Sequence, residues 1–209
     1  MTETAEEHDR ANRQKFDRWA GHFDDWGFAF RYFQKRVLSL MVLRKNSSFL
    51  DLGCGTGWAV CRVASMLEGQ GHFVGVDLSE KMIEKAAENS KDLTHVRFHA
   101  ASAEALPLED ASFDNILCTF SFHHYLNPGK ALSEARRVLK PGGKIYILDG
   151  TPDDFFTRWI DQMAAGIDKG HVKQYSSGEF ARMFSDAGLQ RLESRTILIY
   201  PVKVHIAKK

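Results

Sequence analysis

The sequence predicts a single α/β domain built on one doubly wound sheet of about seven strands, mostly parallel and ending in a C-terminal antiparallel hairpin. Two observations lead to this fold class. Between Phe49 and Leu189, short apolar runs alternate with segments of helical periodicity, which is the pattern of successive βαβ units. A glycine-rich stretch, 53–57, stands directly between the first apolar run and the first helical segment, where doubly wound domains bind ligands.

Residues 1–45 precede this pattern and are charged at first, then aromatic. Phe16, Trp19, Ala20 and Phe23 recur at positions i, i+3, i+4 and i+7, which predicts one amphipathic helix. The rings of this region either seal an edge of the sheet or form a lid over its crevice. They are Phe16, Trp19, Phe23, Trp26, Phe28, Phe30, Tyr32 and Phe33.

Residues 46–150 contain five apolar runs of strand length with helical segments between them. The Pro141-Gly142-Gly143 turn is expected to end the last of these helices and to start the fifth strand. The predicted strands are Ser48–Leu52, His72–Asp77, His95–Ala100, Phe113–Thr119 and Lys144–Asp149, and the predicted helices are Trp58–Leu67, Glu80–Asn89 and Pro128–Leu139.

Residues 151–209 are expected to complete the domain. Apolar side chains at helical spacing over 155–163 predict a helix, which is a second lid candidate. The S-x-x-E pattern at 176–179 is a capping box and predicts another helix from near Gly178, with Gly188 as its left-handed cap. Two β-rich runs follow, and the alternation through 202–206 predicts the closing hairpin.

The bulk composition narrows the class of protein. The chain has 209 residues, which one domain (1–209) can organise around a single core. Its formal net charge of +1 implies neither nucleic acid nor an anionic membrane as a partner. Cys54, Cys61 and Cys118 have no CxxC spacing and are an odd number, which indicates reduced thiols and a cytoplasmic protein. The acidic N-terminus has no apolar leader segment.

The glycine stretch and the acids beside it indicate the kind of ligand. Asp51 stands two residues before the first glycine, where its carboxylate repels phosphate and attracts a cation. Asp77 ends the second strand, twenty positions after Gly57, where an acid can bind both ribose hydroxyls or merely precede the next helix. No Gly-Lys-Ser/Thr follows the glycines, so a P-loop is excluded.

Four segments taken in order resemble the sequence blocks of the class I S-adenosylmethionine-dependent methyltransferase family. They are FLDLGCGTGW, VGVDLSEKMI, ASAEALPLEDASFDNILC and RRVLKPGGKIYILD. The resemblance covers about residues 46–150, and its style is similar to the methyltransferase type 11 branch, which includes ubiquinone and menaquinone biosynthesis enzymes. It implies a Rossmann-like fold with 46–150 as the cofactor-binding core, S-adenosylmethionine as cofactor, S-adenosylhomocysteine as product, and a small-molecule methyl acceptor.

The resemblance also implies roles for individual residues near the methionine and ribose of the cofactor. Asp51 acts on the ammonium group, directly or through water, and Asp77 binds the ribose hydroxyls. Leu78 flanks the adenine, whereas Met82 either flanks it or packs in the core. The implied contacts with the methionine end are Asp51, Gly53, Cys54, Gly55, Thr56 and Gly57.

Further along the chain, the resemblance implies contacts with the adenine and the sulfonium. Ser102 stands where the family often has an Asp that accepts from the adenine amino group, and a serine accepts such a bond more weakly. The Ala103 amide meets a ring nitrogen through its backbone, and Glu104 is either a further contact or an ordinary loop acid. Thr119 and Phe120 fall beside the sulfonium.

Methyl transfer from a sulfonium is an in-line displacement, so alignment and exclusion of water supply much of the rate. A base helps where the acceptor is a hydroxyl or a protonated amine. His123 and His124 follow the fourth strand, and they either act as this base or only lead into the next helix. No metal is expected, because His95 and His99 lie on a predicted strand, roughly 13 Å apart.

Two other functions remain open at this point. An NAD-dependent oxidoreductase shares the fold and the acid after the second strand, but the G-x-G-x-G spacing and Asp51 disfavour a pyrophosphate. A non-catalytic protein that binds S-adenosylmethionine would carry the same loop. The first would bind NADH, and the second would bind the sulfonium cofactor without turnover.

Overall fold

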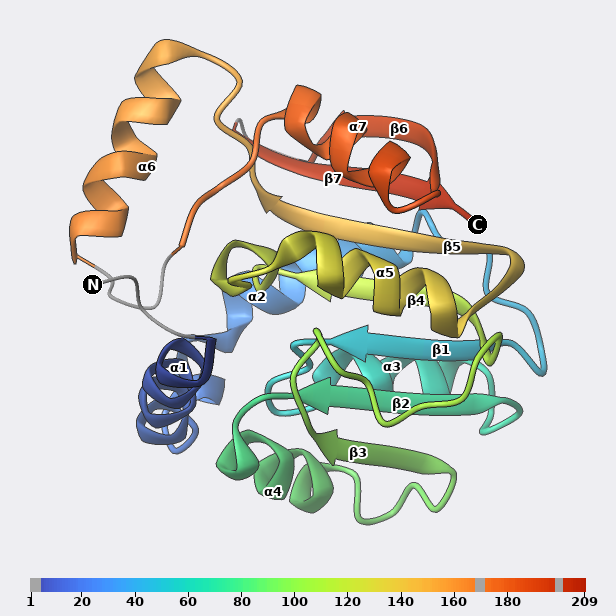
Figure 1. Ribbon diagram of the computed structural model, residues 1–209. Helices are drawn as coiled ribbons and strands as arrows, with labels where there is room; N and C mark the ends of the chain where they lie inside the picture. The colour runs from blue at the N-terminus through green and yellow to red at the C-terminus, as the bar shows by residue number, and fades with distance from the viewer. Residues whose placement is uncertain (1–4, 168–171, 198–200) are drawn as a thin grey trace.

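The computed structural model describes residues 5–167, 172–197 and 201–209. These residues form one seven-stranded sheet with helices on both faces (Figure 1). In chain order the elements are α1 (Ala5–Trp19), α2 (Phe23–Leu38), β1 (Ser48–Leu52), α3 (Trp58–Met66), β2 (His72–Asp77), α4 (Glu80–Asn89), β3 (Val96–Ala100), β4 (Phe113–Thr119), the 3₁₀ turn η1 (Phe122–His124), α5 (Pro128–Val138), β5 (Leu139–Gly150), α6 (Phe155–Ile167), α7 (Ser177–Asp186), β6 (Gln190–Thr196) and β7 (Val202–Lys208).

The sheet has the strand order β3-β2-β1-β4-β5-β7-β6. The first five strands in this order pair in parallel, and β7 runs antiparallel between β5 and β6. The predicted fold class is therefore confirmed, including the C-terminal hairpin. The direction in which the strand order grows reverses between β1 and β4, and the carboxyl ends of strands at such a point leave a crevice for ligands.

The start of β5 differs from the prediction. The strand begins at Leu139 rather than Lys144, so the Pro141-Gly142-Gly143 turn lies inside it. Leu139 pairs with Phe113 and Lys144 with Asn115, so the β5 backbone bulges outward between these two pairs. Gly142 takes a φ of 82° there, which glycine adopts without steric cost. Leu139 is fully buried, and this burial extends the sheet back beyond the turn.

The N-terminal region forms two helices rather than the single amphipathic helix predicted. Phe16 and Trp19 belong to α1, whereas Phe23 is the first residue of α2. The break falls around Gly21, whose side-chain-free backbone is a poor helix former. The apolar spacing nevertheless continues across the break, because both helices turn an aromatic face toward the same crevice, as the lining residues below show.

Helices cover the two faces of the sheet and bury two apolar clusters. On one face α5 and α7 pack against the strands, and on the other α2 and α3 do so (Figure 1). Leu132, Phe180 and Ile116 are fully or almost fully buried on the first face, and Val60 and Phe49 on the second. Fully burying each such side chain contributes roughly 1.5–3 kcal/mol, so the sheet is a rigid platform for its carboxyl end.

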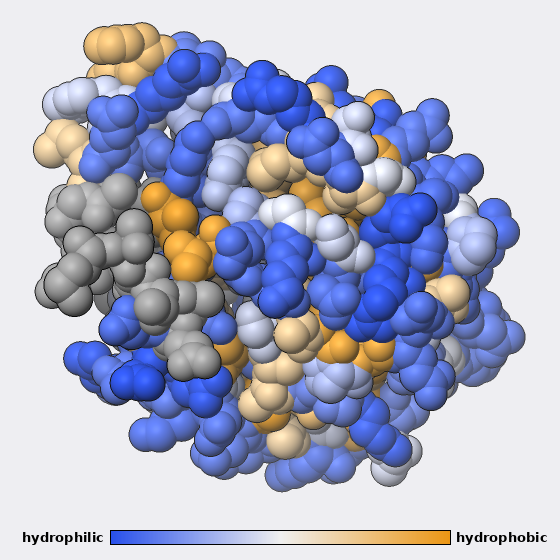
Figure 2. All heavy atoms as spheres, viewed as in Figure 1, coloured by the Kyte–Doolittle hydropathy of each residue, from blue (hydrophilic) through white to orange (hydrophobic). Residues whose placement is uncertain are grey.

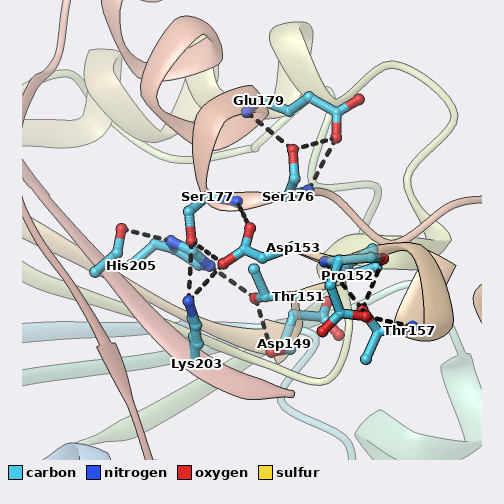
Figure 3. Close-up of polar contacts among 12 residues, drawn as sticks. Asp149, Thr151, Pro152, Asp153, Thr157, Ser176, Ser177, Glu179, Lys203 and His205 are labelled. Atoms are coloured by element: carbon cyan, nitrogen blue, oxygen red, sulfur yellow. Dashed lines mark hydrogen bonds and ion pairs between the residues drawn. The ribbon is translucent and has the colours of Figure 1, made fainter. Parts of the chain in front are cut away.

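A network of polar side chains joins the segment after β5 to the start of α7 (Figure 3). The predicted capping box is present, with Ser176 and Glu179 bonded to each other's backbone N–H. Asp153 accepts from the Ser177 N–H at 2.7 Å and from Lys203 Nζ at 2.5 Å. The residues that precede α6 and those that follow it are therefore bonded to each other, at Asp153 and Ser177.

Helix α6 lies at a corner of the molecule, away from the sheet (Figure 1). Its side chains Phe155, Phe156, Trp159 and Met163 are exposed, the first of them by 87%. Figure 2 shows hydrophobic atoms at the same corner of a largely hydrophilic face. No helix in the described ranges has the length and hydropathy that crossing a membrane requires.

Candidate active site

A cavity of about 370 Å³ opens at the carboxyl ends of β1, β2 and β4, under α1 and α2. This volume lies in the range of roughly 300–1,000 Å³ that is usual for small-molecule sites. The predicted site residues line it, apart from Asp51 and Gly57. The residues concerned are Gly53, Cys54, Gly55, Thr56, Asp77, Leu78, Met82, Ser102, Ala103, Glu104, Thr119, Phe120, His123 and His124.

The glycine loop is held against β2 and shaped for close approach. The N–H groups of Gly53 and Cys54 both donate to the carbonyl of Val76, at 2.8 and 3.0 Å. Gly53 has a φ of 72°, and a Cβ there would lie 2.1 Å from Ser121 Oγ, so no other residue fits. Gly57 caps α3 and packs toward α4 and β3 rather than the cavity; its predicted ligand contact stays a prediction.

Asp51 is fully buried under this loop, behind the cavity lining. Neither carboxylate oxygen has a hydrogen-bond partner among the described residues. Burial, with a smaller contribution from the negative charge of Asp77, raises the pKa of Asp51 well above its usual value. An uncompensated buried carboxylate is costly, and a cation brought to the loop would offset that cost.

Asp77 connects the end of β2 with the glycine loop. Its carboxylate accepts from the Gly55 N–H and from the Ser79 N–H, both at 2.9 Å. Burial raises the pKa of Asp77, although these two N–H donors act in the opposite direction. Each carboxylate oxygen has a second lone pair, so Asp77 can still accept from two hydroxyl groups in the cavity.

The end of β4 forms the wall opposite Asp77. Thr119 Oγ1 accepts from Gln34 Nε2 of α2 at 3.1 Å. Phe120 has a φ of 50°, a left-handed conformation that costs an aromatic residue free energy and is found most often at functional sites. Its ring meets those of Phe30 and Phe33 edge-on, with centroids 5.4 and 5.3 Å away, so α2 holds the strained turn in place.

His123 forms a buried pair with an acid that the sequence analysis did not identify. Its Nδ1 lies 2.8 Å from Asp149 Oδ1, and its backbone N–H donates to Asp149 Oδ2 at 3.0 Å. Burial alone would raise the pKa of Asp149, but the charge and hydrogen bond of His123 lower it overall. Asp149 is the last residue but one of β5, and Asp77 ends β2, so placement near a carboxyl end was the available signal.

Helix α1 reaches across the cavity to the backbone of His124. The carbonyl of His124 accepts from His8 Nε2 at 2.9 Å and from Asn12 Nδ2 at 3.4 Å. The rings of Phe16 and His124 meet edge-on at 5.2 Å. His8 and Asn12 were not predicted, because nothing in the local sequence shows that their partner lies more than 100 positions away.

The lid predictions can be compared with the cavity. Of the aromatic residues named, Phe16, Trp19, Phe23 and Phe30 line it, whereas the side chain of Trp26 lies outside the described part of the structure. The α6 side chains that the structure describes do not line it. The division into a lid region, a core and a lid helix therefore stays a prediction. The described residues contain no cluster of three or more His, Cys, Asp or Glu suited to a metal.

Comparison with known proteins agrees with this geometry. Residues 50–147 match the family model described as "Methyltransferase domain". The chain is 32% identical over 156 residues to an uncharacterised methyltransferase, YcgJ, of Bacillus subtilis, covering 71% of this chain and 60% of that protein. It is 34% identical over 119 residues to a demethylmenaquinone methyltransferase of Staphylococcus aureus, covering 57% and 49%.

Solved structures lead to the same family. The crystal structure of YcgJ superposes with a TM-score of 0.70 at 29% identity, covering 80% of this chain and 73% of that one. A SAM-dependent methyltransferase of Aquifex aeolicus has a TM-score of 0.69 at 26% identity, covering 84% and 88%. The chain spans 36%, 60% and 58% of the length of three curated relatives that it matches. The match over the glycine loop and the seven-stranded sheet makes this chain a member of the class I S-adenosylmethionine-dependent methyltransferases.

Proposed function

We propose that this chain transfers the methyl group of S-adenosylmethionine to a small-molecule acceptor with an oxygen, nitrogen or carbon nucleophile. The observation that carries the proposal is Asp51, a buried carboxylate without a hydrogen-bond partner among the described residues, beneath a glycine loop that lines the cavity. Such a group matches the ammonium of the cofactor's methionine moiety, reached directly or through a water.

The cavity also fits the remaining parts of the cofactor. The backbone of 53–56 provides close approach for the methionine chain, and Asp77 has lone pairs for both ribose hydroxyls. Leu78, Met82, Ala101 and Ala103 also line the cavity and would hold the adenine. When bound, the cofactor supplies an electrophilic methyl group on a sulfonium.

An NAD-dependent oxidoreductase is less consistent with the charges of the site. A pyrophosphate over the glycine loop would lie near two carboxylates, Asp51 and Asp77, both of which are at the loop. Repulsion between such groups is strong where water is excluded. A sulfonium and an ammonium, each positively charged, reverse the sign of this interaction.

The His123–Asp149 pair is the best placed base. With its Nδ1–H directed at Asp149, the imidazole carries its lone pair on Nε2, and His123 lines the cavity. In the proposed step, His123 would take the proton of an acceptor O–H or N–H, and the bound cofactor would supply the methyl group that replaces it. Asp149 stabilises the imidazolium that forms. His124 is secondary, because the contact established for it is that of its backbone carbonyl with α1, whereas the ring of His123 is bonded to an acid.

Ligand binding tests the assignment directly. Calorimetry of the wild-type protein with S-adenosylhomocysteine, S-adenosylmethionine and NADH is expected to give micromolar binding of the two sulfur ligands only. Asp77→Ala should weaken both by about 10- to 150-fold, since it removes hydrogen bonds to a charged group worth roughly 1.5–3 kcal/mol. Binding of NADH alone would contradict the proposal. Binding without methyl transfer to any of a panel of phenols, carboxylic acids, amines and quinols would favour the non-catalytic alternative.

For an acceptor with a hydroxyl or protonated amine, His123→Gln is expected to lower kcat by about 10²–10⁴-fold, the usual contribution of a general base. The dissociation constant of S-adenosylhomocysteine should stay unchanged. His124→Gln is the matched control, because it alters the adjacent imidazole and leaves the pair with Asp149 intact. A larger loss in the control than in His123→Gln would show that the base is wrongly assigned.

A further inference from the structure

Helix α1 is fastened at both sides of the cavity. At one side, His8 and Asn12 bond the carbonyl of His124 in η1. At the other, Asp17 accepts from Ser79 Oγ, the N-cap of α4, at 2.5 Å. Figure 1 shows α1 at the carboxyl ends of β1 and β2. The inner side of α1, including Asp9 and Asn12, therefore forms a wall of the cofactor cavity.

Three polar residues meet where this wall faces the loop after β3. Ser102 and Glu104 come from the loop, and Asp9 comes from α1. Both oxygens of Glu104 are occupied, because they accept from the backbone N–H and the Nδ2 of Asn127 at 2.8 and 3.0 Å. Ser102 lies near the carboxylate of Asp9 and lowers its pKa, against the larger effect of burial, which raises it. Glu104 is thus already held by two donors, and Asp9 is the other acid of this group.

Two further observations show unmet hydrogen-bonding capacity at this wall. Asn12 is 3% exposed and lines the cavity, yet its Oδ1 has no partner among the described residues. Burial, followed by the nearby charge of Glu104, raises the pKa of Asp9. Asn12 Oδ1 is therefore an acceptor without a donor among the described residues, and the Asp9 carboxylate lies in the same wall, beside the proposed adenine position. The exocyclic amino group of adenine offers two N–H donors.

We infer that Asp9 recognises the adenine amino group, with Asn12 Oδ1 as a neighbouring acceptor, and that α1 thereby selects a 6-amino purine. This inference rests on the proposed cofactor site. Ser102 and Asp9 line the same part of the cavity, so the carboxylate of Asp9 can act where Ser102 offers only a weaker acceptor. A 6-oxo purine would place a carbonyl oxygen against Asp9, which repels it.

The test compares S-adenosylhomocysteine with its deaminated 6-oxo analogue by calorimetry. The wild type is expected to prefer the amino form by about 10- to 150-fold. In Asp9→Asn, the amide can present either its carbonyl or its NH₂, so the preference should fall to within about threefold because the 6-oxo form gains while the amino form loses. Asp17→Asn is the control, because it loosens α1 without touching the cavity and should leave the ratio of the two affinities unchanged.

The possible results distinguish an error in the cofactor site from an error in the role given to Asp9. Failure of the wild type to bind S-adenosylhomocysteine would overturn the cofactor site itself. If the wild type binds that ligand but does not discriminate between the pair, the cofactor site stands and the role of Asp9 is wrong. A parallel loss of both ligands in Asp9→Asn, matching Asp17→Asn, would show that Asp9 only holds α1 in place, which also contradicts the inference.

Discussion

Replacing Asp51 with asparagine is expected to make the ligand-free protein more stable and to weaken its binding of S-adenosylhomocysteine. The wild-type carboxylate is fully buried and has no partner in the described structure, a defect that costs about 1–3 kcal/mol or more for a charged group. Removing the charge should raise Tm by roughly 2–4 °C per kcal/mol. Affinity should fall by about 10- to 150-fold, since the ligand's ammonium loses its counter-charge.

The pH dependence of this gain has a defined sign. The folded-state pKa of Asp51 is raised, so its contribution to stability is fully present below the unfolded pKa and is lost as pH rises toward the folded pKa. The advantage of Asp51→Asn should therefore grow with pH. Differential scanning calorimetry at pH 5 and pH 8, with and without S-adenosylhomocysteine, measures both effects.

Asp114→Asn serves as the matched control for this experiment. Asp114 is the second residue of β4, at the opposite end of the strand from the cavity, and its carboxylate accepts from Ser48 and from Lys140 Nζ. Those contacts are lost or weakened in the variant, so it should be less stable and still bind the ligand normally. A lower Tm for ligand-free Asp51→Asn, or unchanged affinity in it, would contradict the role given to Asp51.

The second large effect is expected from His205, which is fully buried in β7 (Figure 3). Its Nε2 lies 2.9 Å from Thr151 Oγ1, its Nδ1 lies 2.8 Å from Ser194 Oγ, and its ring stacks on Phe180. Burial lowers the pKa of His205 from 6.5 to about 4. The charges of Asp153, Lys203, Asp149 and Arg191 act in opposing directions and contribute less.

The lowered pKa of His205 makes the free energy of unfolding depend on pH between about pH 4 and pH 6.5. Between pH 6.5 and about 4 the unfolded chain binds a proton at His205 that the folded protein does not. The free energy of unfolding therefore decreases as the pH is lowered from 6.5 to about 4. The total loss is about 3 kcal/mol, at about 1.4 kcal/mol per pH unit. Below about pH 4 the folded form is protonated as well, and this contribution no longer changes. Urea unfolding at pH 7.5, 6.5, 5.5 and 4.5 measures it.

In His205→Asn the slope across this window should largely disappear, although the variant is less stable at pH 7.5 because one of the two hydroxyl bonds is lost. His99→Gln, on the edge strand β3, is the control and should retain the wild-type slope. An unchanged slope in His205→Asn would mean that other groups, such as Glu179 with its pKa lowered to about 2, govern the acid sensitivity.

The cofactor half of the molecule was predictable because its signals are local. Short stretches of consecutive residues predict each of its features. These features are the order of strands and helices from Ser48 to Asp149, the turn around Gly53 and the acid at the end of β2. Steric requirements at glycine and apolar periodicity act over a few positions. The predicted residues consequently met in one cavity, with Asp51 and Gly57 placed just behind it.

The remaining features depend on partners distant in the chain. Asp149 stands near the end of a predicted strand, but its pairing with His123 is visible only once β4 and β5 are adjacent. The contact of His8 with the His124 carbonyl spans 116 positions. The early start of β5 follows from burial of Leu139 against Phe113. Tertiary contacts override local propensity in such cases.

The way that the α6 segment is attached has a consequence for how this protein can diverge. Asp153 and Ser177 are bonded to each other, so the chain between them is an excursion whose two ends are already joined at the edge of the sheet. The entropy of closing such an excursion changes by only about 0.6 kcal/mol for each doubling of its length. Evolution can therefore lengthen, shorten or exchange this segment as a cassette, while the sheet and the glycine loop keep their geometry.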